Sequence, residues 1–236
     1  MNALPLTGLI DRRILINFRA DPAVVSKLLP APFRPQLQAG SAMVGICLIR
    51  LKQERLRGLP VAFGLTSENG AHRIAVEWEV GSGLQQGVYI PRRDTSSRIN
   101  CLVGNQLIGK HYHSKFWVKE QDGSYAVSFL SSDGTSLAVE AQETTIWPST
   151  SIFASLEQAS EFYQNGATGY SPNASGPGFR GVKLSTRQWQ VSALSVGNVI
   201  SSYFEDATLF PHDSVVFDNA LLMTNTAHEW RRLSAL

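Results

Sequence analysis

The chain has 236 residues, of which 43% are hydrophobic and 17% are charged, and its formal net charge is +2. This composition supports a sizeable packed core and excludes a disordered chain. The charges are scattered rather than gathered into basic runs, so nucleic acid is not expected as a partner. No stretch approaches the ~20 apolar residues of a membrane helix, so no membrane association is expected either.

The cysteines and the N-terminal sequence indicate the cellular compartment. Cys47 and Cys101 are the two cysteines, and each lies in an apolar, strand-like stretch. We interpret them as buried, reduced side chains of a protein from a reducing compartment. The N-terminal residues lack a charged segment followed by a long apolar one, so no secretory signal is expected. The sequence therefore predicts a cytoplasmic protein.

The first predicted elements are a strand, a short helix and a second strand. Residues 13–19 alternate apolar and polar side chains, which is typical of a strand with one buried face. Asp21 is a good helix N-cap and Pro22 suits the first helical position, so we expect a helix that ends before Pro30. Residues 42–51 are apolar except for Arg50, which predicts a strand buried on both faces.

The rest of the chain predicts many more strands and one more helix. Asp122-Gly123 lies between two alternating segments and predicts a β-hairpin. The segment Ser155–Gln158 fits a capping box, and the helix that it begins is expected to end near Gly166. Residues 166–181 are rich in Gly, Ser, Asn and Pro and predict a long loop. Further strands are predicted at residues 73–80, 87–90, 99–103, 114–120, 124–130, 135–142, 182–193, 198–204 and 214–223.

These elements predict the fold class. Strands are numerous, only two helices are clear, and strands and helices do not alternate regularly. A parallel, doubly wound sheet is therefore excluded. We expect an α+β fold dominated by antiparallel sheet, curled into a barrel or cone, in a single domain that spans residues 1–236.

The segment from Gly104 to Val118 is the richest in chemistry. Lys110, His111, Tyr112 and His113 are four consecutive candidates for proton transfer or nucleophilic attack, and Lys115 follows closely. In a strand, side chains alternate between two faces, so His113 and Lys115 are expected on the same face. We expect any chemistry of this protein to involve this segment.

Two stretches make the chain resemble the acetoacetate decarboxylase superfamily. Ile16–Pro32 looks like the first strand and helix of that superfamily, which end in a Leu-Pro-x-Pro-like signature. Gly104–Gly109 looks like its Gly-Arg-Glu-hydrophobic-hydrophobic-Gly segment. The resemblance extends over roughly residues 10–205 and rests on the order and spacing of degenerate motifs. It implies an acetoacetate decarboxylase-like barrel or cone with about two flanking helices.

The resemblance is closer to an uncharacterised bacterial branch of the superfamily, a conserved domain of unknown function. That branch carries a Glu-Leu-Asn-x-Arg motif, a Gly-Val-aromatic strand and a Gly-Leu-Pro-Tyr-His segment. The corresponding positions here are Glu68, Asn69, Arg73, Gly87–Ile90 and Gly109–His113.

One departure from true decarboxylases matters for the chemistry. Those enzymes use a Schiff-base lysine beside a second lysine, whose charge lowers the pKa of the first. This chain has no Lys-Lys pair. An ungapped alignment from Gly104 places Tyr112 and His113 at the two lysine positions, and neither side chain forms an imine. A gap in the alignment would bring Lys110 or Lys115 into that role.

The resemblance implies roles for seven candidate residues. Tyr112 and His113 would transfer protons, and Glu68 would be a second acid or base; the lysines Lys110 and Lys115 are the alternative nucleophiles. The carboxylate anchor of the substrate would be Arg73 or Arg98.

Each of these candidates also has an ordinary structural explanation. Tyr112 and His113 could be half-buried residues that form ordinary hydrogen bonds in a barrel wall. Glu68 could be a residue of a surface turn, and the lysines and arginines could be solvated charges. Arg92, Arg93 and Arg98 form either a solvated basic loop or a rim that receives an anion.

Two functions remain open from the sequence. The first is an enzyme of lyase or isomerase type that acts on a small oxo-acid or carboxylate without Schiff-base decarboxylation. The second is a non-catalytic protein that binds or carries a small ligand. Neither requires a cofactor, and the spacing of the histidines and cysteines does not suggest a metal site. The resemblance is compatible with a homo-oligomer.

Overall fold

The computed structural model describes residues 5–81, 83–174, 176–234 and 236, without the side chains at 103 and 105–107. Residues 1–4, the beginning of the N-terminal segment considered above, lie outside that description. The helices are α1 (Pro22–Leu28), the short 3-10 helix η1 (Val61–Phe63), α2 (Arg98–Leu107) and α3 (Leu156–Asn165). The strands are β1 (Leu6–Ala20), β2 (Arg34–Pro35), β3 (Leu37–Gln38), β4 (Ser41–Leu56), β5 (Leu65–Val80), β6 (Gly83–Thr95), β7 (His111–Gln121), β8 (Ser124–Ser131), β9 (Ser136–Thr144), β10 (Thr168–Pro172), β11 (Phe179–Thr186), β12 (Ser192–Ser201) and β13 (Val215–Arg232).

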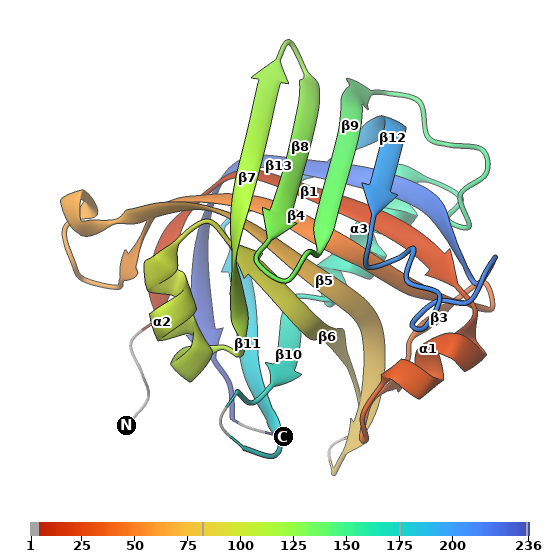
Figure 1. Cartoon of the computed structure of the whole chain (residues 1–236), viewed down its shortest axis with the longest axis horizontal. Helices are drawn as coiled ribbons and strands as arrows, with labels where there is room; N and C mark the ends of the chain where they lie inside the picture. Colours follow the sequence, from red (N-terminus) through yellow and green to blue (C-terminus); the bar gives the residue numbers. More distant parts are fainter. Residues whose placement is uncertain (1–4, 82, 175, 235) are drawn as a thin grey trace.

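All strands belong to one sheet that closes on itself twice (Figure 1). A small ring of hydrogen-bonded strands runs β5, β4, β1, β13, β11, β10, β6 and back to β5. A large ring runs β6, β7, β8, β9, β12, β13, β1, β4, β5 and back to β6. The pairs β10–β6 and β6–β7 are parallel, and the other pairs are antiparallel. The predicted α+β class with a mostly antiparallel, barrel-like sheet is confirmed.

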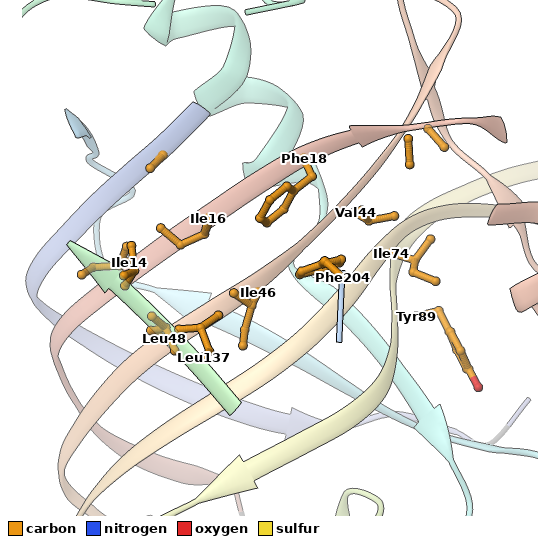
Figure 2. Close-up of a cluster of buried hydrophobic side chains, with 14 of the residues drawn as sticks. Ile14, Ile16, Phe18, Val44, Ile46, Leu48, Ile74, Tyr89, Leu137 and Phe204 are labelled. Carbon is orange, nitrogen blue, oxygen red and sulfur yellow. The ribbon is translucent and has the colours of Figure 1, made fainter. Parts of the chain in front are cut away.

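Strands β1, β4 and β5 are buried on both faces because they belong to both rings. Their even-numbered apolar side chains point into the large ring, where they pack with residues of β6, β9 and the segment after β12 (Figure 2). We call this group the large-ring cluster; the figure labels Ile14, Ile16, Phe18, Val44, Ile46, Leu48, Ile74, Tyr89, Leu137 and Phe204. Odd-numbered side chains of the same strands point into the small ring. The prediction that residues 42–51 form a strand buried on both faces is confirmed.

One helix was not expected from the sequence. Residues 99–103, predicted as a strand, lie within helix α2. The Ser97 side chain caps this helix by accepting a hydrogen bond from the backbone N–H of Asn100 at 3.2 Å. A segment of five residues, four of them apolar, is compatible with either a strand or a helix, so its periodicity could not decide. None of the described helices is long and apolar enough to cross a membrane.

Two further segments are more regular than predicted. Strand β6 continues to Thr95, so Arg92 and Arg93 lie in a strand and not in a polar loop. The region 166–181, predicted as a loop, contains β10 and the beginning of β11. Its Gly- and Ser-rich composition hid these strands, although they are the ones that close the small ring.

Candidate functional site

The small ring encloses a cavity of about 170 Å³, and α2 and α3 contribute to its wall. Leu15 on β1, Ile49 on β4, and Val88 and Ile90 on β6 make much of the lining apolar. An apolar cavity of roughly 150 Å³ accepts a molecule of the size of benzene. The cavity therefore has room for a ligand of a few heavy atoms.

Small side chains leave this space open on the strand surface. In the antiparallel register, Cys47 of β4 lies opposite Ala71 of β5, and Ala71 lies opposite Arg93 of β6. Gly45 of β4 lies opposite Arg73 of β5. Because Ala and Gly fill little space, the long arginine side chains have room to extend across the cavity surface.

Three arginines from neighbouring strands line the cavity: Arg13 on β1, Arg73 on β5 and Arg93 on β6. Arg13 donates from Nε to Cys47 Sγ at 3.2 Å, and Arg93 donates from Nε to Ser171 Oγ at 3.1 Å. These partners are neutral groups. Within the described residues, none of the three arginines forms an ion pair with a carboxylate.

Arg73 is the most deeply buried of the three. Its side chain belongs to a residue that is 7% exposed, it donates from Nη2 to Asn17 Oδ1, and its guanidinium carbon lies 4.8 Å from the centre of the Tyr163 ring. Burial lowers its pKa, and the nearby charge of Arg13 adds to that effect. Burial also lowers the pKa of Arg93, to about 10.

Each cavity arginine has one buried nitrogen that finds no hydrogen-bond partner in the described part of the chain. These atoms are Nη1 of Arg13, Nε of Arg73 and Nη2 of Arg93. A buried charged donor without an acceptor is costly, and native proteins rarely keep one without a reason. All three donors belong to arginines that line the same cavity.

Two carboxylates also belong to the cavity wall, and neither neutralises the arginines. Asp94 receives two hydrogen bonds from Arg92, each at 2.8 Å, and a third from Ser114 Oγ at 2.9 Å. Glu54 lies beside His228, with 3.9 Å between Oε1 and Nε2. The lining therefore carries an excess of positive charge around the three arginines.

His111 and Tyr163 add polar groups to the same cavity. Nδ1 of His111 lies 2.7 Å from the backbone oxygen of Gly109. Burial and the charge of Arg93 lower the pKa of His111 to about 4, so its ring is neutral at pH 7. Gly104 makes room for this ring, since a Cβ at that position would lie 2.7 Å from His111 Nδ1. Burial raises the pKa of Tyr163, so its phenol stays protonated.

Of the seven residues predicted as the site, Arg73 lines the cavity. Tyr112 lies outside the lining, with its ring centre 4.0 Å from the guanidinium carbon of Arg92 and 4.5 Å from Lys110 Nζ. Both positive charges are cation–π partners of the ring. Tyr112 thus belongs to a packed group beside the cavity wall.

Four other predicted residues are exposed to solvent. His113 and Lys115 project from β7 on its outer face, and Arg98 is the first residue of α2. Lys110, just before β7, is exposed as well. The structure does not bring these side chains together with Arg73.

Glu68 belongs to an ion-pair network on the other face of the strands. It accepts from Arg12 and from Arg50, each at 2.5 Å, and both arginines also bond to Glu120. Although burial opposes it, the hydrogen bonds from Arg50 and Arg12 hold the pKa of Glu120 below its ordinary value. Each arginine of this network is ion-paired with carboxylates, which the cavity arginines are not, although Nε of Arg12 also lacks an acceptor among the described residues.

Sequence reasoning missed Arg13, Tyr163 and Cys47. It named His111 as a candidate for proton transfer without including it in the predicted site, and it considered Arg93 only as part of an anion-receiving rim. The sequence does contain a signal for some of these residues. Arg13, Cys47 and Arg73 occupy odd positions, and each is followed directly by an even-numbered residue of the large-ring cluster. A charged residue in a strand that is buried on both faces must point into a cavity or form a buried pair. Among the described residues, no group of three His, Cys, Asp or Glu side chains is arranged to hold a metal ion.

Comparison with known proteins places the chain in a family. The family model of DUF2071, described as an uncharacterized conserved protein, matches residues 10–219. The chain belongs to this family. Comparison with curated proteins gives no match.

Solved structures of low sequence identity share the fold of this family member. An acetoacetate decarboxylase from Legionella pneumophila subsp. pneumophila str. Philadelphia 1 superposes with a TM-score of 0.66 at 10% identity, over 99% of this chain and 88% of that one. An acetoacetate decarboxylase-like enzyme from Sphingomonas wittichii RW1 gives 0.62 at 12% identity, over 100% and 92%. The enduracididine biosynthesis enzyme MppR, complexed with pyruvate, gives 0.64 at 10% identity, over 100% and 91%. The predicted resemblance to the acetoacetate decarboxylase superfamily and to its uncharacterised branch is confirmed.

Proposed function

We propose that the protein binds a small carboxylate, and specifically a small oxo-acid, in the cavity of the small ring. The observation that carries this proposal is the set of three cavity arginines, each with a buried nitrogen that lacks an acceptor. A carboxylate supplies two acceptor oxygens and a negative charge in one planar group, which suits the guanidinium fork. Binding would satisfy donors that the free protein leaves unpaired.

The rest of the lining supports an oxo-acid of modest size. The apolar side chains around the arginines suit a short carbon chain, and a cavity of about 170 Å³ limits the length of that chain. One fold relative, MppR, has been solved with pyruvate. We carry this ligand class over to the present chain as part of the proposal.

The chemistry proposed for this cavity does not use an imine. In the described lining there is no lysine, and Lys110 and Lys115 lie on the outside of the molecule. The neutral ring of His111 can accept a proton from a bound oxo-acid, and the protonated phenol of Tyr163 can donate one. Their pKa shifts make the imidazole a weak base and the phenol a weak acid. Enolisation, the step common to isomerases and many lyases, needs such a pair and a cation beside the carbonyl oxygen.

Binding is tested by calorimetry with pyruvate, acetoacetate and, as a neutral control, acetone. Arg73→Gln and Arg93→Gln should weaken carboxylate binding by about 10- to 100-fold, because each removes charged hydrogen bonds worth ~1.5–3 kcal/mol. Arg98→Gln, outside the cavity, is the matched control and should bind as the wild type does. Equal affinity in all variants, or no binding of any carboxylate by the wild type, would refute the proposal.

Two further measurements separate the kinds of activity. In D2O, NMR should show loss of the pyruvate methyl proton signal with the wild type and a much slower loss with His111→Gln. Binding without proton exchange would instead favour the non-catalytic carrier function, which the missing lysine also supports. Borohydride reduction in the presence of pyruvate should leave the intact mass unchanged; an adduct on Lys110 or Lys115 would contradict the exclusion of imine chemistry.

A further inference from the structure

We infer that the thiol of Cys47 is a nucleophile that adds reversibly to the carbonyl carbon of the bound oxo-acid. The inference rests on the proposed function, because it takes the carboxylate of the ligand to be held by the cavity arginines. It adds a covalent step and a residue for which sequence reasoning gave only a structural role.

The position of Cys47 carries the first part of the argument. It lies on β4 between Leu15 of β1 and Ala71 of β5, and the next residue in this row is Arg93 of β6. Arg13 and Arg73 lie two residues away on the adjacent strands, next to Ile49 and Gly45 respectively. Cys47 is thus the reactive side chain at the centre of the three arginines, and it lines the cavity.

The contacts of the Cys47 sulfur are the second part of the argument. Cys47 is a free thiol, and its Sγ accepts the hydrogen bond from Arg13 Nε at 3.2 Å. The same guanidinium lies over the Trp189 ring, 5.5 Å from the ring centre. These contacts hold Arg13 in place, so Sγ faces the cavity beside a fixed positive charge.

An independent observation indicates that a ligand belongs beside this thiol. Arg73 is 7% exposed and lines the same cavity, and its Nε has no acceptor among the described residues. A buried guanidinium nitrogen in this state needs an oxygen that the chain does not supply. A ligand whose carboxylate meets Arg73 would place its adjacent carbonyl carbon within the zone that Cys47 lines.

The proposed step is balanced without any further reactant. The sulfur forms a bond to the carbonyl carbon, and the π bond of the carbonyl breaks toward its oxygen. The thiol proton passes to that oxygen, which gives a thiohemiketal from a ketone or a thiohemiacetal from an aldehyde. Guanidinium N–H groups of the cavity would stabilise the negative charge on the oxygen before the proton arrives. The reverse step releases the oxo-acid unchanged.

Cys101 provides a matched control within the chain. It is also a free thiol, but it lies on α2, is only partly buried, and does not line the cavity. Burial and the charge of Asp94 raise the pKa of its thiol. The two cysteines therefore differ in position, burial and neighbouring charge, and a thiol reagent should react with them at different rates.

Carbon NMR of pyruvate labelled at the carbonyl carbon tests the inference. With excess wild-type protein or Cys101→Ser, a new signal of a tetrahedral carbon should appear, and with Cys47→Ser it should be absent. Calorimetry on the same samples keeps the two proposals apart. Pyruvate that binds to the wild type without the new signal overturns the role of Cys47 and leaves the proposed function intact. Pyruvate that does not bind overturns the proposed function itself.

Alkylation of the wild type gives a second test that does not depend on the folding of a variant. Iodoacetate carries a carboxylate and iodoacetamide does not, so the cavity arginines should favour iodoacetate at Cys47. We expect the ratio of the iodoacetate rate to the iodoacetamide rate to be at least about tenfold higher at Cys47 than at Cys101, corresponding to ~1.4 kcal/mol. Peptide mass spectrometry measures both sites at once. Equal ratios, or a Cys47 that reacts with neither reagent, would overturn the inference.

Discussion

The two faces of strands β1, β4 and β5 differ in chemistry although the same backbone supports both. On the large-ring face, Ile14, Ile46 and Leu48 are all 0% exposed and pack against other apolar side chains. On the small-ring face, Arg13, Cys47 and Arg73 surround a cavity. The comparison teaches that one strand can supply both a close-packed core and a polar cavity wall, because its side chains alternate between the faces.

Charged residues on the two faces differ in whether they have carboxylate partners. Arg12 points toward the large ring and is bonded to two carboxylates, Glu68 and Glu120. Its neighbour in sequence, Arg13, points into the small ring and has no carboxylate partner in the described part of the chain. Paired charge is a structural feature, whereas unpaired charge on a cavity is available to a ligand.

The largest single loss of stability is expected when one isoleucine on each face is truncated in turn. Ile46→Ala should lower the free energy of unfolding by about 3–4 kcal/mol, since it opens a void among closely packed side chains. Ile49→Ala should cost only about 1–2 kcal/mol, because Ile49 already borders a cavity. Urea titrations of both variants measure the difference. Equal losses would mean that the small-ring face is packed as closely as the large-ring cluster.

The next comparison exchanges one arginine on each face for methionine. Arg12→Met should cost about 3 kcal/mol of unfolding free energy, because it leaves two carboxylates short of a partner. Arg73→Met should leave the stability of the ligand-free protein unchanged or raise it by about 1 kcal/mol, since it removes a buried charge without a counter-ion. Thermal unfolding without ligand checks both. A loss at Arg73 as large as that at Arg12 would show that Arg73 is a structural residue.

The smallest of the three effects depends on pH. Burial, aided by the charge of Arg92, lowers the pKa of His72 to about 3, and its ring packs against Tyr203 on the large-ring face. The unfolded chain therefore binds a proton below pH ~6.5 that the folded chain does not. The stability that depends on His72 is fully present above pH ~6.5 and is lost as the pH falls, by about 2 kcal/mol at pH 5.

His72→Phe should remove that part of the pH dependence, as measured by urea titrations at pH 5 and pH 7. Tyr203→Phe keeps the histidine and its aromatic contact, so it is the matched control and should retain the full loss. A His72→Phe variant with the same loss between pH 7 and pH 5 as the control would show that His72 does not govern the acid sensitivity.

The sequence predicted most of the fold because binary patterns reflect burial directly. The nearly continuous apolar run 42–51 favoured a strand covered on both faces, and the alternation in β7 and β8 around Asp122-Gly123 predicted the hairpin. Helix α2 was not predicted because its apolar segment is short, and β10 was not predicted because Gly and Ser are common in loops. Ring closure depends on pairings between residues far apart in sequence, such as β11 with β13, and no local pattern encodes them.

The site was harder to predict than the fold. Arg73 was selected from a motif, yet nothing local distinguishes an arginine that faces a cavity from one that faces solvent. The polarity of the segment 110–115 drew attention to β7, where several of its polar side chains are exposed. Whether an arginine on these strands faces a cavity depends on the small ring, which covers the odd-numbered face of β1, β4 and β5. That cover is a property of the complete topology.

The shared strands have a consequence for how such a protein diversifies. A substitution at Arg13, Cys47 or Arg73 changes the shape or charge seen by a ligand, while the adjacent even-numbered residues continue to hold the large-ring cluster. Selection for a new ligand and selection for a stable fold therefore act on alternate residues of the same strands. Descendants of one ancestor could exchange their reactive groups freely and still keep the architecture, even after most of their sequence identity has been lost.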